Sequence, residues 1–160
     1  MDATGSEAAP PIPASSLPPI LASTIAESRG VGRMVFLEFT LSRDGSAQLI
    51  GAQGARGRAK PSVLQRTPGH IRYDAYDRSG RLTFSGTVPD PLHQRWEHPA
   101  EDDSDRIAVT IAAPSHAPLF LRIPGEADAF SLVLRRPSSP QSNETEFTWD
   151  AFAAFDLSPP

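Results

Sequence analysis

The densest run of side chains that could do chemistry is "DPLHQRWEHPAEDDSDR", at residues 90–106. Carboxylates on a flexible loop can bind Ca²⁺, and two histidines with a carboxylate can bind Zn²⁺ or Cu²⁺. The two histidines are five residues apart, which is neither a helical pair nor a same-face strand pair, and the acidic run lacks the glycine and terminal glutamate of an EF-hand loop. A solvated, charged loop is the alternative interpretation. The candidate metal ligands are His93, His98, Glu101, Asp102, Asp103 and Asp105.

Patterns typical of enzymes are missing from the sequence. The chain contains no cysteine, which excludes disulfides, thiolate metal sites and cysteine nucleophiles. No G-x-S-x-G, H-E-x-x-H or Gly-rich phosphate loop occurs, and "GAQGAR" at residues 51–56 lacks the Lys-Ser/Thr ending of a phosphate loop. The sequence therefore predicts a non-enzymatic protein, and a divalent ion at the loop from His93 to Asp105 is the one cofactor that it suggests.

An aromatic tail, "ETEFTWDAFAAFDLSPP", closes the chain at residues 144–160. The spacing of its aromatic residues suits either an edge strand or a turn of helix. These side chains need cover, so we expect the tail to dock on the core or on a protein partner. A free sheet edge is a second candidate for partner binding. The candidate partner-binding residues are Phe147, Trp149, Phe152 and Phe155.

The elements that must position these residues read as β-strands. In "RMVFLEFTLS", residues 33–42, apolar side chains alternate along one face, and Gly45 in the next turn favours a hairpin to "AQLIGAQ". The polar, glycine-rich segment at 51–62 reads as a loop. A second hairpin of the same kind is "HIRYDAYDRSGRLTFSGTVPDPL", residues 70–92, which turns at Asp77-Arg78-Ser79-Gly80.

Three more strands complete the set. In "RIAVTIAA", residues 106–113, Ile107, Val109 and Ile111 are expected to face inward, and "LFLRI" and "AFSLVLRR" follow. Seven short strands over residues 33–136, joined by turns, predict an all-β, antiparallel, immunoglobulin-like β-sandwich. A small β-barrel is the alternative.

The prolines divide the chain into segments. Residues 1–19 form a Pro/Ala/Ser-rich spacer that we expect to be flexible, residues 20–136 the β-sandwich domain, and residues 137–160 a Pro/Ser linker with the aromatic tail. Within "PILASTIAES", residues 19–28, the sequence allows either a helical turn that ends before Gly30 or a first strand.

Charge and hydropathy limit the classes of partner and the cellular compartments that fit this sequence. The formal net charge of −4 argues against a nucleic-acid binder, and no apolar run is long enough to span a bilayer. No signal peptide begins the sequence as given, but residues 1–19 read like the spacer that follows a removed one. Lys60 is the only lysine among 15 basic residues, which is typical of a GC-rich bacterial genome. We therefore expect a periplasmic or secreted bacterial protein, with an intracellular interaction domain as the alternative.

Two segments, "IRYDAYDRSGRLTFSGTVPDP" and "APLFLRIPGEADAFSLVLRR", resemble the immunoglobulin-like β-sandwich accessory modules of Gram-negative envelope and secreted proteins. A "GR" turn and an "LRIP" strand recur in those modules. The resemblance covers about fifty residues. It implies a non-catalytic module of the cell envelope that binds a protein or has a structural role, and it carries no functional residues.

Overall fold

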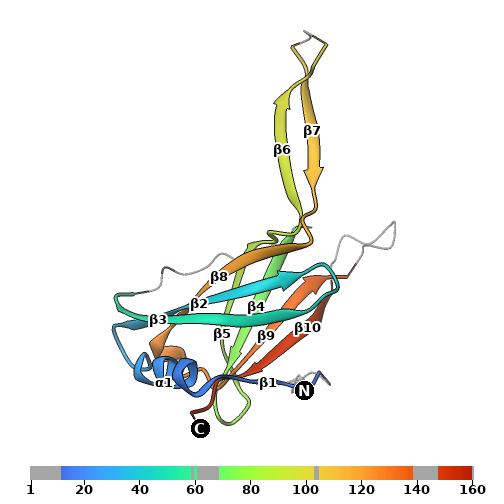
Figure 1. The fold of residues 1–160 in the computed structure, drawn as a ribbon. Helices are drawn as coiled ribbons and strands as arrows, with labels where there is room; N and C mark the ends of the chain where they lie inside the picture. The colour runs from blue at the N-terminus through green and yellow to red at the C-terminus, as the bar shows by residue number, and fades with distance from the viewer. Residues whose placement is uncertain (1–11, 59, 61–68, 103–104, 139–147, 160) are drawn as a thin grey trace, which may run out of the picture.

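The computed structural model describes residues 12–58, 60, 69–102, 105–138 and 148–159, which are mostly β-structure (Figure 1). In chain order the elements are β1 (Ser15–Ser16), α1 (Pro19–Glu27), β2 (Arg33–Ser42), β3 (Ala47–Arg56), β4 (His70–Tyr76), β5 (Leu82–Pro89), β6 (Gln94–Pro99), β7 (Ile107–Ala112), β8 (His116–Pro124), the 3-10 turn η1 (Gly125–Ala127), β9 (Ser131–Pro137) and β10 (Trp149–Asp156).

Two sheets pack face to face and form the body of the molecule (Figure 1). One sheet has the strand order β3-β2-β8 and the other the order β1-β10-β9-β4-β5. All pairs in them are antiparallel except the short pair of β1 with β10. The rings of Phe39 on β2 and Phe155 on β10 lie 5.0 Å apart between the sheets. The predicted all-β, antiparallel, sandwich-like fold is confirmed, and in the described part of the chain the two sheets do not join into a barrel.

The order of the strands in the two sheets can be compared with that of an immunoglobulin domain. A constant-type immunoglobulin domain places its first, second, fourth and fifth strands in one sheet. Without the short β1, the two sheets contain seven strands, and the first, second and fifth of them (β2, β3 and β8) share a sheet, but the fourth (β5) lies in the other. The strand order of the described residues therefore differs from that of a constant-type immunoglobulin domain. The predicted set of seven also differs from this one, because it contains residues 106–113 and lacks β10.

Alternation along the strands determines which side chains form the core. On β2 the exposed fractions of Val35, Leu37, Phe39 and Leu41 are 4% or less, and the residues between them are more exposed. The same pattern runs along β8 from Ala117 to Ile123. Successive side chains on a strand point to opposite faces, so each of these strands buries one complete face between the two sheets.

The two predicted hairpins are present, β2 with β3 and β4 with β5. Gly45 (φ 90°) and Gly80 (φ 81°) supply the left-handed conformation that each turn needs. The first hairpin is longer than predicted, because the segment interpreted as a loop from residue 51 continues β3 to Arg56. The glycines of this segment are compatible with a strand because β2 pairs with it along its whole length.

Residues 19–27 form the helix α1, so the helical alternative is the correct one of the two that the sequence allows for this segment. Pro19 is the first helical residue, a position where the missing N–H costs nothing. The helix buries Ala22 and Ile25, and its end packs on β3 at Gly54, where a Cβ atom would lie 2.3 Å from the Ser28 hydroxyl.

The aromatic tail belongs to the folded body. Residues 149–156 form β10, which pairs with β9 along its whole length and with β1 near its end. The expected domain boundary after residue 136 therefore falls inside β9, which pairs with β10 in the same sheet. The expected flexible spacer also shortens, because residues 15–16 form β1 and the helix begins at Pro19. Residues 1–11 of that spacer lie outside the described residues.

Candidate functional site

A two-stranded hairpin, hereafter the arm (residues 94–112), projects from the body between β5 and β8 (Figure 1). It consists of β6, β7 and the tip between them. The six residues of β6 pair with the six of β7, from Gln94 opposite Ala112 to Pro99 opposite Ile107. In the described part of the chain these strands pair only with each other. The arm therefore offers two free edges and two faces.

One face of the arm carries an apolar row on β7, hereafter the apolar face. Ile107, Val109 and Ile111 form this row; in the register with β6, Pro99 lies directly opposite Ile107, while the charged Glu97 lies opposite Val109. The exposed fractions of the three β7 side chains are 69%, 45% and 70%. The prediction that these three residues point into the core is wrong. Their alternation is that of a core strand, but neither sheet of the described body covers them.

The other face of the arm is mixed. Trp96 lies opposite Thr110, and His98 lies opposite Ala108. The Trp96 side chain is 59% exposed. His98 is held on the surface, with Nδ1 2.9 Å from the Pro99 carbonyl oxygen and Nε2 2.8 Å from the Thr110 hydroxyl. This face adds an exposed indole ring to the apolar surface of the arm.

A buried carboxylate anchors the leg of the arm that leaves β5. Asp90 is 4% exposed, and its Oδ1 accepts the backbone N–H of Leu92. Its Oδ2 accepts Nε–H of Arg136 on β9 at 3.0 Å and lies 3.3 Å from His93 Nδ1. Leu92 is itself buried in the core. The guanidinium of Arg136 stacks over the Phe152 ring, 4.2 Å from its centroid, so β10 supports the same anchor.

The other leg of the arm is held by the turn between β2 and β3. The backbone N–H of Arg43 donates to the Ser115 carbonyl at 2.9 Å. The Arg43 side chain donates to the Ala113 carbonyl. Both legs are thus fixed at the body, and the part beyond them extends into solvent as a preformed unit. Such an element binds a partner at a low ordering cost.

The candidate metal ligands are spread along this arm. His93 is at the base beside Asp90, and His98 is on β6. Glu101, Asp102 and Asp105 are exposed at the tip, where Asp102 pairs with Arg106 at 2.7 Å. Asp103 lies outside the described residues. Among the described residues, no three histidine or acidic side chains gather closely enough to hold an ion.

The metal hypothesis stays a prediction, because an ion can draw a loop together. Part of the predicted loop is a strand, because residues 94–99 form β6. The candidate ligand His98 therefore lies on a strand. A calorimetric titration of chelator-treated protein with Ca²⁺, Zn²⁺ and Cu²⁺ tests it.

The aromatic residues of the tail have different surroundings. Phe155 is 2% exposed and packs on Phe39, so it is a core residue of this chain. Phe152 and Trp149 are half-buried, Phe152 beneath Arg136. Phe147 lies outside the described residues. The tail finds its cover on the body, one of the two outcomes expected from the sequence.

The sequence contains one signal for the arm. The charge of the run 94–99 favours a loop, yet this run pairs along its whole length with the strand of β-branched residues after it. A polar, acidic tip between two short runs is a hairpin pattern. The anchor was not visible, because Asp90 and Arg136 are 46 residues apart.

Comparison of the chain with protein-family models, with curated proteins and with solved structures finds no match. Among the described residues, no helix has the length and apolar character needed to cross a membrane. The case for a function therefore rests on the arm and its surroundings.

Proposed function

We propose that this chain is a non-enzymatic binding or structural module of the bacterial cell envelope, and that it engages a protein partner through the arm. The observation that carries the proposal is the exposure of Ile107, Val109 and Ile111 on one face of a projecting hairpin. A contiguous exposed apolar surface on a folded protein typically marks an interaction site.

The form of the arm supports a protein as the partner. The two outer edges of a hairpin carry unpaired backbone donors and acceptors, and an extended segment of another chain can add to such an edge. The side chains of the apolar face would then pack on the partner, and Trp96 would contact it from the other face. Aromatic residues are common among those that dominate binding energy.

The envelope assignment is supported by the resemblance of two segments to envelope modules. An intracellular interaction domain is the alternative, and fractionation of the native cells distinguishes the two. Recovery in the cytoplasmic fraction would remove the envelope assignment and leave the arm's role intact. Turnover of generic ester, peptide or glycoside substrates would contradict the non-enzymatic class.

The test of binding compares the wild-type chain with the variant Ile107→Ser/Ile111→Ser as baits in extracts of the native cells. We expect the variant to lose the partner that the wild type captures, because two anchors of the apolar face become polar. Its unfolding temperature should stay close to wild type, since both side chains are outside the core. Ile50→Ser is the matched control, because Ile50 is 48% exposed on the body. Equal capture by all three baits would contradict the proposal.

A further inference from the structure

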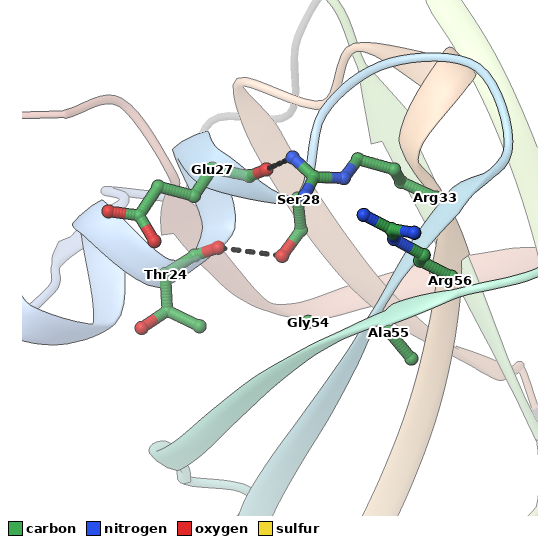
Figure 2. Close-up of a pocket in the computed structure, with 7 residues that line it drawn as sticks. All are labelled: Thr24, Glu27, Ser28, Arg33, Gly54, Ala55 and Arg56. Atoms are coloured by element: carbon green, nitrogen blue, oxygen red, sulfur yellow. Dashed lines mark hydrogen bonds between the residues drawn. The ribbon is translucent and has the colours of Figure 1, made fainter.

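A small hollow lies where the end of α1 meets the ends of β2 and β3, on the body and separate from the arm (Figure 2). Its volume is about 280 Å³. The helix wall is formed by Thr24 and Ser28, whose hydroxyls each donate to a carbonyl one helical turn earlier. Gly54 lets this wall lie directly against β3. Because both hydroxyl protons are donated within the helix, they are not available to a ligand. Hydrogen-bond donors for a ligand in the hollow must come from other residues.

Two arginines supply those donors. Arg33 on β2 and Arg56 on β3 are directly opposite each other in the strand register, so their side chains share one face of the sheet. Both are exposed. Figure 2 shows both guanidinium groups reaching into the space beside the end of α1. Like charges directly opposite each other destabilise a pair of strands.

No carboxylate of the described residues forms an ion pair with either arginine. Arg33 donates from Nη1 to the backbone carbonyl of Glu27, which fixes the direction of its guanidinium. The carboxylate of Glu27 points away from both arginines in Figure 2. Arg58 and Lys60 follow β3 in the sequence and are exposed.

We propose that this hollow is an oxyanion site, in which a phosphate or carboxylate group binds between the guanidinium groups of Arg33 and Arg56. A guanidinium presents N–H donors in a planar fork that matches two oxygens of such a group. An anion placed there would also relieve the repulsion between the opposed cations. The volume is just below the range for small-molecule sites, which fits a small anion or the charged end of a larger ligand.

The test is calorimetric titration of the full chain with sodium phosphate and, separately, with sodium succinate at constant ionic strength. We expect saturable binding of at least one of the two anions. The anion with the higher affinity shows whether the site prefers a phosphate or a carboxylate group. Arg56→Gln should weaken it by about tenfold or more, because a charge-assisted contact is lost. Arg122→Gln is the matched control and should bind like wild type, because Arg122 is exposed on the opposite face of the same sheet.

A thermal measurement guards against a variant that simply folds poorly. The preferred anion should raise the unfolding temperature of the wild type more than chloride does, by mass action, and this difference should vanish in Arg56→Gln. Equal binding by wild type and Arg56→Gln, or no heat from either anion at tens of millimolar, would overturn the proposal. Neither readout involves the arm, so the result is independent of the protein-binding function.

Discussion

Asp74 on β4 is a carboxylate that the fold buries among cations. It is 1% exposed; Oδ1 accepts Arg72 Nε–H at 2.8 Å and the Ser85 hydroxyl at 2.5 Å, and Oδ2 accepts Arg135 Nε–H at 2.9 Å. Arg135, itself 7% exposed, also donates to the Tyr76 hydroxyl at 3.1 Å. These contacts link three strands of the five-stranded sheet, β5, β4 and β9, on its outer face.

Asp74→Ala should lower the free energy of unfolding by about 3–5 kcal/mol, because it removes the carboxylate that neutralises a buried arginine. Urea unfolding followed by far-UV circular dichroism measures this difference. Asp150→Ala, at an exposed position of β10, should stay within about 0.5 kcal/mol of wild type. A loss at Asp74 no larger than at Asp150 would show that the network contributes nothing to stability.

At the scale of elements, the turn of the second hairpin is organised by one carboxylate. Asp77 Oδ1 accepts the backbone N–H groups of Ser79 and Arg81 at 2.9 and 3.0 Å and the Ser79 hydroxyl at 2.6 Å. These hydrogen bonds, those of Ser79 foremost, together with the charge of Arg81, hold the pKa of Asp77 below its ordinary value of 3.8. The ionised side chain thus closes the turn between β4 and β5.

The sign of the resulting pH dependence is fixed by the lowered pKa. A group with a lower pKa in the folded state stabilises the fold above its unfolded-state pKa, and this contribution is lost as the pH falls through the folded value. Asp77→Ala should therefore unfold at a lower temperature than wild type at neutral pH. The two proteins should converge as the pH is lowered below 3.8. A constant difference across that range, in thermal scans from pH 7 to 2, would contradict the assigned cause.

The arm shows how one element depends on others that are distant in sequence. Its legs are held by Asp90 with Arg136 and by Arg43, and Arg136 in turn rests on Phe152 of the tail. The aromatic tail therefore supports the arm from within the body. This gives the tail a role in positioning the proposed contact surface.

At the scale of the whole molecule, the strands and turns could largely be predicted from the sequence. The alternation in residues 33–42 and the glycine turns after β2 and β4 are local properties, and local geometry determines them. The helix at residues 19–27 was one of two alternatives, because a short apolar run suits both periods.

The position of the arm could not be predicted in this way. Ile107, Val109 and Ile111 alternate as a core strand does, and alternation shows that a strand has two faces without showing what covers them. Cover depends on which sheets stack, which is a property of the whole chain. The opposed arginines of the hollow could not be predicted for a related reason, since the glycine-rich pattern from residue 51 favours a loop and leaves Arg56 outside the strand.

Site-specific photo-crosslinking tests the central claim, that the arm contacts a protein, most directly. A photoreactive residue replaces Val109 on the apolar face in one protein and Ile50 on the body in another, and each is irradiated in the native cells. The account predicts a discrete adduct of the chain with one other protein from position 109 and none from position 50. No adduct from position 109, or the same adduct from both positions, would contradict it.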